Sequence, residues 1–184
     1  NHSLSDWIGQ SKLILLTAHR RENLGDPLKN IFKAINKIID NTDNVKVIYP
    51  IHLNPLIRDA ANKYLKNDDK IKIISPLDVL DFHNLMNKSY LILTDSGGIQ
   101  EEAPALGKPV LVLRDTTERP EGVEAGTLKL IGTSIESIYE NTIQLLTNED
   151  EYKKMACALN PYGDGTASKQ IADALIQELN NKFQ

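Results

Sequence analysis

The stretch "YLILTDSGGIQEEAPALGKPVLVL", residues 90–113, contains a complete strand–helix–strand pattern. Residues 90–94 and 109–113 are short apolar runs, which is the pattern of strands buried on both faces of a parallel sheet. Between them, residues 98–106 have the length and composition of a short helix. The stretch therefore predicts a βαβ unit, and with it an α/β fold.

The same alternation extends over the rest of the chain. Further strands are expected at 12–18, 45–51, 71–74 and 127–131, and further helices at 26–40, 54–65, 79–88, 135–147, 149–158 and 165–183. In the helix at 26–40, Asp26 is the expected N-cap and Pro27 the expected first residue. Strands alternating with helices, without hairpins, predict a Rossmann-like, mostly parallel sheet with helices on both faces.

Composition restricts the class of protein. The chain has 184 residues, of which 41% are hydrophobic, enough for one compact core. A net charge of -4 argues against a nucleic-acid partner. No apolar run is long enough to cross a bilayer, so we expect a cytoplasmic protein without a membrane partner. A single cysteine, Cys157, provides neither a disulfide nor a thiolate cluster, and we expect no metal and no cofactor.

Polar residues follow the expected strands. In parallel sheets, ligands bind beyond the carboxyl ends of the strands. The loops there are "AHRREN" (18–23), "PIHLNP" (50–55), "SPLDVLDF" (75–82), "DSGGIQEE" (95–102) and "RDTTERPEG" (114–122). Two histidines, four arginines and several acids therefore converge on one rim of the sheet.

Ser96, Gly97 and Gly98 stand between a buried strand and the start of a helix. Glycines let a ligand approach the backbone, and the first N–H groups of a helix suit a phosphate. Glu101 and Glu102 then have two interpretations, which the residues alone leave open. They are either acids that favour the helix dipole, or one of them accepts the hydroxyls of a ribose.

The two other charged loops also have alternatives. Taken alone, residues 18–23 are typical of a solvated charged loop, although their arginines suit a diphosphate. His52 alone is typical of a loop histidine bonded to backbone. Arg119 precedes Pro120, which restricts its backbone and favours a positioned functional arginine over a mobile one.

Four motifs together resemble a known family. "TAHRREN", "YPIHLNP", "LTDSGGIQEEAPALGKPVLVLRDTTERPEGVEAGT" and "NPYGDG" are similar to the C-terminal domain of non-hydrolysing UDP-N-acetylglucosamine 2-epimerases, from about Lys12 onward. The resemblance implies one half of a GT-B-type two-domain fold. It implies an interdomain linker at 1–11, a Rossmann-like UDP-binding domain at 12–164, and a C-terminal helix at 165–184 that packs on an N-terminal domain missing here.

The resemblance also implies roles for substrate-binding residues. Ser96, Gly97 and Gly98 would hold the diphosphate of UDP or UDP-N-acetylglucosamine. Glu102 would bind the ribose hydroxyls, and Phe82, with its neighbouring backbone, the uracil.

Four further residues match family positions. His19 and Arg119 would contact the phosphate and sugar end, and His19 would be catalytic by supporting the departing phosphate. Arg20 and His52 match positions that contribute to an allosteric site for a second UDP-N-acetylglucosamine.

The reaction implied interconverts UDP-N-acetylglucosamine and UDP-N-acetylmannosamine by elimination and re-addition of UDP. In the family the acids that handle the C2 proton belong to the N-terminal half, so we expect this chain to bind UDP but to be inactive alone. We expect the full-length protein to form a homodimer. A GT-B glycosyltransferase, a hydrolysing 2-epimerase and a non-catalytic nucleotide-binding module remain as alternatives.

Overall fold

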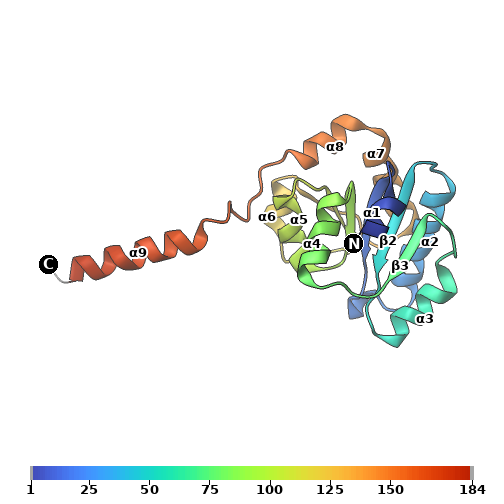
Figure 1. Cartoon of the computed structure of the whole chain (residues 1–184), viewed down its shortest axis with the longest axis horizontal. Coiled ribbons are helices and arrows are strands. Elements are labelled where there is room, and N and C mark those ends of the chain that lie inside the picture. The colour runs from blue at the N-terminus through green and yellow to red at the C-terminus, as the bar shows by residue number, and fades with distance from the viewer. Residues whose placement is uncertain (1, 183–184) are drawn as a thin grey trace.

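A computed structural model describes residues 2–182 and contains one parallel sheet of six strands (Figure 1). The strands are β1 (Lys12–Thr17), β2 (Val45–Pro50), β3 (Ile71–Ile74), β4 (Leu91–Thr94), β5 (Val110–Val112) and β6 (Leu128–Leu130). Their order is β3-β2-β1-β4-β5-β6, and every neighbouring pair is parallel. The chain adds strands outward on one side of β1 and then on the other. The crevice between the ends of β1 and β4 is therefore the topological switch point, where such sheets bind ligands.

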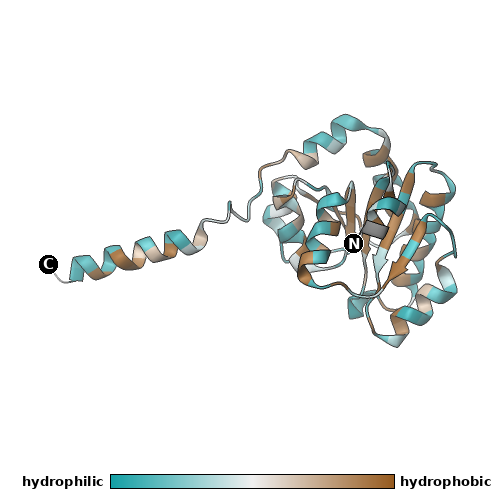
Figure 2. Ribbon diagram, in the orientation of Figure 1, coloured by the Kyte–Doolittle hydropathy of each residue, from teal (hydrophilic) through white to brown (hydrophobic). Residues whose placement is uncertain are grey.

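Helices cover both faces of this sheet, as the sequence predicts. They are α1 (His2–Ile8), α2 (Asp26–Asp40), α3 (Pro55–Tyr64), α4 (Val79–Lys88), α5 (Gly97–Ala105), α6 (Pro120–Glu124), α7 (Ile135–Thr147), α8 (Glu149–Ala156) and α9 (Ala167–Lys182), with a 3-10 turn η1 at Arg21–Asn23. Helices α2, α3 and α7 share one core with Ile14 and Leu16 of β1. Helices α1, α4 and α5 share a second core with Leu13 and Leu15. Successive side chains of β1 thus enter opposite layers, which is why its four central residues, 13–16, are all apolar. Brown, apolar segments run through the sheet in Figure 2.

The expected elements are present, and three local details differ. Helix α2 begins at Asp26, and its N-cap is Gly25, whose φ of 91° suits a glycine. The turn η1 and the helix α6 lie in loops for which the sequence indicated no element. Residues 1–11, expected as a linker, contain α1, in which Ile8 is buried and the Trp7 indole donates to the carbonyl of Asp69.

Helix α9 extends away from the rest of the domain (Figure 1). None of its residues is buried, and its large apolar side chains, Ile171, Leu175, Ile176 and Leu179, are each more than half exposed. No helix among residues 2–182 is long and apolar enough to cross a membrane.

Candidate functional site at the switch point of the sheet

The site begins where β1 and β4 end side by side. The hydroxyls of Thr17 and Thr94 lie 2.6 Å apart in a hydrogen bond, and both side chains are buried. Thr94 also accepts a hydrogen bond of 2.9 Å from the backbone N–H of Ser96. These contacts fix the turn that leads into α5, so the N-terminus of that helix opens at the crevice.

Asp95 fastens the loop after β1 to the loop after β4. Its carboxylate is fully buried, and its Oδ2 accepts hydrogen bonds from the backbone N–H groups of His19 (2.9 Å) and Arg20 (2.8 Å) and from Asn23 Nδ2 (3.0 Å). Burial and the charge of Asp95 raise the pKa of Tyr49, whose hydroxyl stays protonated and donates to the carbonyl that precedes His19. Asp95 was not predicted from the sequence as a site residue, although an acid directly after a buried strand was a signal.

Two arginines converge on the first residue of α5. A methyl group in place of the Gly97 hydrogen would lie 3.3 Å from Nη2 of Arg20 and 3.7 Å from Nη2 of Arg119. The first N–H groups of α5 have no partner within the helix. Gly97 thus leaves a space between two guanidinium groups and a helix N-terminus, which together suit a phosphate or diphosphate.

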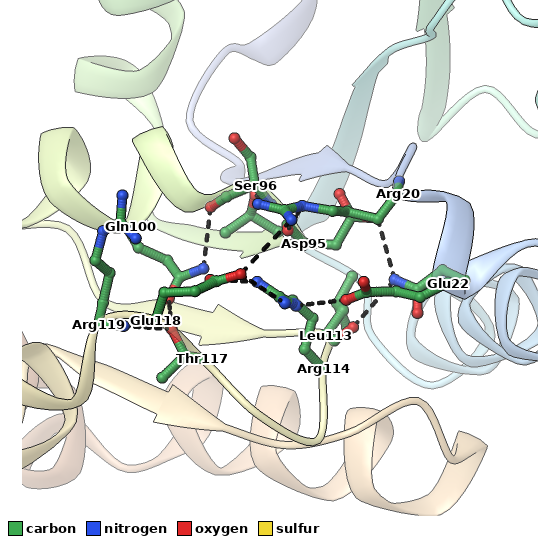
Figure 3. Close-up of polar contacts among 12 residues, drawn as sticks. Arg20, Glu22, Asp95, Ser96, Gln100, Leu113, Arg114, Thr117, Glu118 and Arg119 are labelled. Carbon is green, nitrogen blue, oxygen red and sulfur yellow. Dashed lines mark hydrogen bonds and ion pairs between the residues drawn. The ribbon is translucent and has the colours of Figure 1, made fainter.

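A buried arginine holds the loops around this space (Figure 3). Arg114, at the end of β5, donates to Glu22 at 2.6 Å and to Glu118 at 2.7 and 3.0 Å. Glu118 also lies 3.7 Å from Arg20. Hydrogen bonding from Arg114 lowers the pKa of Glu118 to about 2, so this carboxylate is charged at neutral pH.

Gln100 joins α5 to the loop that carries Arg119 (Figure 3). Its side chain is fully buried; it donates to the carbonyl of Ser96 at 3.1 Å and accepts from the Thr117 hydroxyl at 2.6 Å. Thr117 in turn accepts from the backbone N–H of Arg119 at 3.0 Å. Neither Gln100 nor Arg114 was predicted as a supporting residue, because the contacts of Gln100 with Thr117 and of Arg114 with Glu22 form only in the folded chain.

The structure separates the roles of the two adjacent glutamates. Since α5 starts at Gly97, both lie beyond its first turn, so the interpretation of Glu101 and Glu102 as acids that favour the helix dipole is wrong. The dipole effect falls off within that turn. Glu101 accepts a hydrogen bond from Arg119, while Glu102 lies 3.1 Å from Nε2 of His83 on α4. Glu102 is exposed, and one of its oxygens would lie 3.6 Å from a methyl group on Gly98.

The remaining candidates lie on the same edge of the sheet. The rings of His19 and His52 stack with centroids 5.4 Å apart and planes 7° apart. Phe82 is half-buried and packs against the core that includes Ile99. His83 follows Phe82 and contacts Glu102, so α4 and α5 border one surface. Across residues 2–182, no cluster of three or more histidine, cysteine or acidic side chains could hold a metal ion.

Comparison with known proteins gives a consistent result. A family model described as UDP-N-acetylglucosamine 2-epimerase matches residues 1–176. The UDP-N-acetylglucosamine 2-epimerase of Bacillus subtilis (strain 168) is 62% identical over 96% of this chain and 46% of its own length. The chain spans about half the length of the curated relatives it matches.

Solved structures agree with this result. The structure of S. aureus MnaA with UDP has a TM-score of 0.91 and 54% identity, covering 96% of this chain and 48% of that one. The UDP-GlcNAc 2-epimerase of Neisseria meningitidis, bound to UDP-GlcNAc, has a TM-score of 0.86 and 46% identity, covering 95% of this chain and 49% of that one. These matches confirm the expected α/β, Rossmann-like fold of the GT-B type.

Proposed function

This chain belongs to the UDP-N-acetylglucosamine 2-epimerase family, and from that premise we propose that it is the UDP-binding part of an enzyme that interconverts UDP-N-acetylglucosamine and UDP-N-acetylmannosamine. The observation that carries the proposal is the convergence of Arg20 and Arg119 on Gly97 at the start of α5. Two cations and unpaired helix N–H groups around an open space form a site for a diphosphate.

The nucleotide extends from this site across α4 and α5. Ser96 and Gly98 hold the diphosphate together with Gly97. Among the described residues the Ser96 side chain makes no capping hydrogen bond to α5, so its hydroxyl is available to a ligand. Glu102 binds the ribose hydroxyls, which requires it to exchange or share its contact with His83. The uracil lies at the start of α4, near Phe82.

The chemistry follows from where charge develops. Breaking the anomeric C–O bond places negative charge on the departing diphosphate, which preorganised cations and helix N–H groups stabilise. Arg20 and Arg119 provide those cations, and His19 supports the phosphate by giving it a proton or a hydrogen bond. Arg20 and His52 also contribute to the second, allosteric nucleotide-sugar site.

Inversion at C2 needs a base and an acid on opposite faces of the sugar. In the described part of the chain, the carboxylates around the arginine pair are engaged: Glu101 with Arg119, Glu118 with Arg114, and Asp95 with backbone N–H groups. We therefore assign the C2 proton transfers to groups outside these 184 residues, on a second domain against which α9 packs. The homodimer and the cytoplasmic location stay predictions.

Product analysis separates the alternatives. Family membership favours an epimerase over a GT-B glycosyltransferase, which would need an acceptor. A hydrolysing enzyme would release free N-acetylmannosamine and UDP, whereas re-addition keeps the sugar on UDP. A non-catalytic nucleotide-binding module would form neither free N-acetylmannosamine nor an epimerised UDP-sugar, even when a second domain is added to it.

The first test is a calorimetric titration of this chain with UDP, with UMP and ADP as controls. Saturable binding that prefers UDP supports the proposal, because UMP lacks the second phosphate and ADP lacks the uracil. If a folded sample binds none of them, or binds UMP as well as UDP, then the site between Arg20 and Arg119 is not a diphosphate site of this chain.

A further inference from the structure

The two oxygens of the Asp95 carboxylate have different surroundings. Oδ2 accepts all three hydrogen bonds that this side chain receives, from two backbone N–H groups and from Asn23. Oδ1 is also buried, yet within residues 2–182 it has no hydrogen-bond partner. A buried carboxylate oxygen without a partner is costly, so a partner for Oδ1 is to be expected nearby.

The atom that faces Oδ1 is Nδ1 of His19, at 3.6 Å. This separation is a few tenths of an ångström beyond a hydrogen bond, and the His19 side chain, 40% exposed, has room for the small rotation that closes it. The backbone N–H of His19 is already bound to Oδ2, so the same carboxylate holds the backbone of His19 and faces its ring.

We propose that Asp95 is a positioning residue for His19: its free Oδ1 holds a proton on Nδ1, so that Nε2 is the atom of His19 that takes up or releases a proton. A carboxylate can only accept a hydrogen bond, so a neutral His19 beside it carries its hydrogen on Nδ1 and leaves the Nε2 lone pair free. The same carboxylate stabilises the imidazolium that forms when Nε2 is protonated.

This assignment deepens the role proposed for His19, and only its last step rests on the proposed function. When UDP leaves, the Nε2–H bond breaks, an O–H bond forms on the diphosphate, and the electron pair stays on the imidazole. Re-addition of UDP reverses the transfer. The tautomer of the ring in the free protein does not depend on that chemistry.

His52, stacked on His19, is an internal reference with the opposite arrangement. Its Nδ1 accepts a hydrogen bond of 3.1 Å from the backbone N–H of Asn54. A neutral His52 therefore carries its hydrogen on Nε2. Two parallel rings 5.4 Å apart are thus expected to hold opposite tautomers, one set by a carboxylate and the other by an amide.

The variant Asp95→Asn tests this reasoning, because its amide can take only one orientation. All three groups at the Oδ2 position are N–H donors, so the amide oxygen must face them and the NH₂ must face His19. An NH₂ group donates to Nδ1, which moves the ring hydrogen to Nε2. The loop contacts are kept while the tautomer changes, as in the corresponding substitution of a Ser-His-Asp triad.

The experiment is long-range ¹H–¹⁵N NMR of the chain labelled at histidine, at alkaline pH, with the UDP titration run on the same samples. We expect the Nδ1–H tautomer for His19 and the Nε2–H tautomer for His52 in the unaltered chain. Asp95→Asn should convert His19 alone. Asn23→Ala is the matched control, since it removes one donor to Oδ2 and leaves Oδ1 in place, and it should leave the His19 tautomer unchanged.

An Nε2–H tautomer of His19 in the unaltered chain overturns the proposal. So does an Nδ1–H tautomer of His19 that persists in Asp95→Asn, or a change of the His19 tautomer in Asn23→Ala. If Asp95→Asn does not fold, the tautomer of His19 in the unaltered chain tests the proposal by itself. If the tautomers are as expected but UDP does not bind, the proposed function fails and the Asp95–His19 couple stands.

Discussion

Replacing Gly97 by alanine should separate folding from nucleotide binding. The backbone of Gly97 does not have a positive φ, and its neighbours at 3.3 and 3.7 Å are the ends of two flexible arginine side chains. An alanine therefore fits after small rotations of Arg20 and Arg119. Because alanine restricts the unfolded chain and favours a helix, the free energy of unfolding should rise by about 0.4–1 kcal/mol.

The same methyl group occupies the space in which a phosphate would meet the two guanidinium groups. A hydrogen bond to a charged group contributes about 1.5–3 kcal/mol, and each 1.4 kcal/mol is tenfold in affinity. Displacing one of the two arginines from the ligand should therefore weaken UDP binding by about 10- to 100-fold. The loss should fall on the diphosphate, so UMP binding should change less than UDP binding.

The assay combines denaturant unfolding with calorimetric titration of UDP, on the unaltered chain, Gly97→Ala and Gly98→Ala. A methyl group on Gly98 would face an oxygen of Glu102 at an ordinary 3.6 Å and not the arginines, so its effect on affinity should be the smaller one. Equal affinities of the unaltered chain and a well-folded Gly97→Ala variant would show that no phosphate occupies this space.

Three further perturbations test the supporting contacts. Glu102→Ala should weaken the binding of the ribonucleotide UDP more than the binding of the corresponding deoxyribonucleotide. Glu101→Ala, which frees Arg119 from its hydrogen bond, should weaken the binding of both nucleotides alike. The same selectivity in both variants would contradict the division of roles between the two glutamates. Arg114→Gln should raise the pKa of Glu118 from about 2 toward its ordinary value near 4.5. Carboxyl ¹³C NMR over a pH titration measures this change. Since the pKa of Glu118 is lowered in the folded chain, its contribution to stability is full above its ordinary pKa and is lost as the pH falls toward 2. If the pKa of Glu118 is the same in Arg114→Gln as in the unaltered chain, Arg114 is not the cause of the lowered pKa. Gly122→Ala should lower the free energy of unfolding by about 1–3 kcal/mol, because its Cβ would lie 2.5 Å from a leucine methyl group and from a tyrosine hydroxyl; an unchanged denaturation midpoint would contradict this packing.

Much of the fold could be predicted from local patterns. The runs at 12–18 and 90–94 became β1 and β4, because a strand buried on both faces needs apolar residues at every position. Asn54 is the N-cap of α3, a position at which asparagine is favoured, and its side chain accepts from the N–H of Leu56 at 3.0 Å. The helix α1 was missed because "HSLSDWI" is short and shows no clear helical periodicity of apolar residues.

The candidate site was predictable in place but not in detail. The carboxyl ends of parallel strands meet at one edge whatever the loops contain, so the loops after β1 and β4 had to converge. The sequence could not predict which acid pairs with which cation. Glu101 and Glu102 are neighbours in the chain, but the rotation of about 100° per residue along a helix directs one to Arg119 and the other to His83.

The sequence by itself determined the order of strands and helices, the apolar layers and the rim on which charged loops gather, because these depend on periodicities of a few residues. Only the tertiary structure decided the pairings that make the rim a site: Asp95 with the loop at 19–23, Arg114 with Glu22, and two arginines with Gly97. Those partners lie about 20 to 100 residues apart in the chain. Their meeting depends on which strands become neighbours, and that choice is made by the packing of the whole sheet.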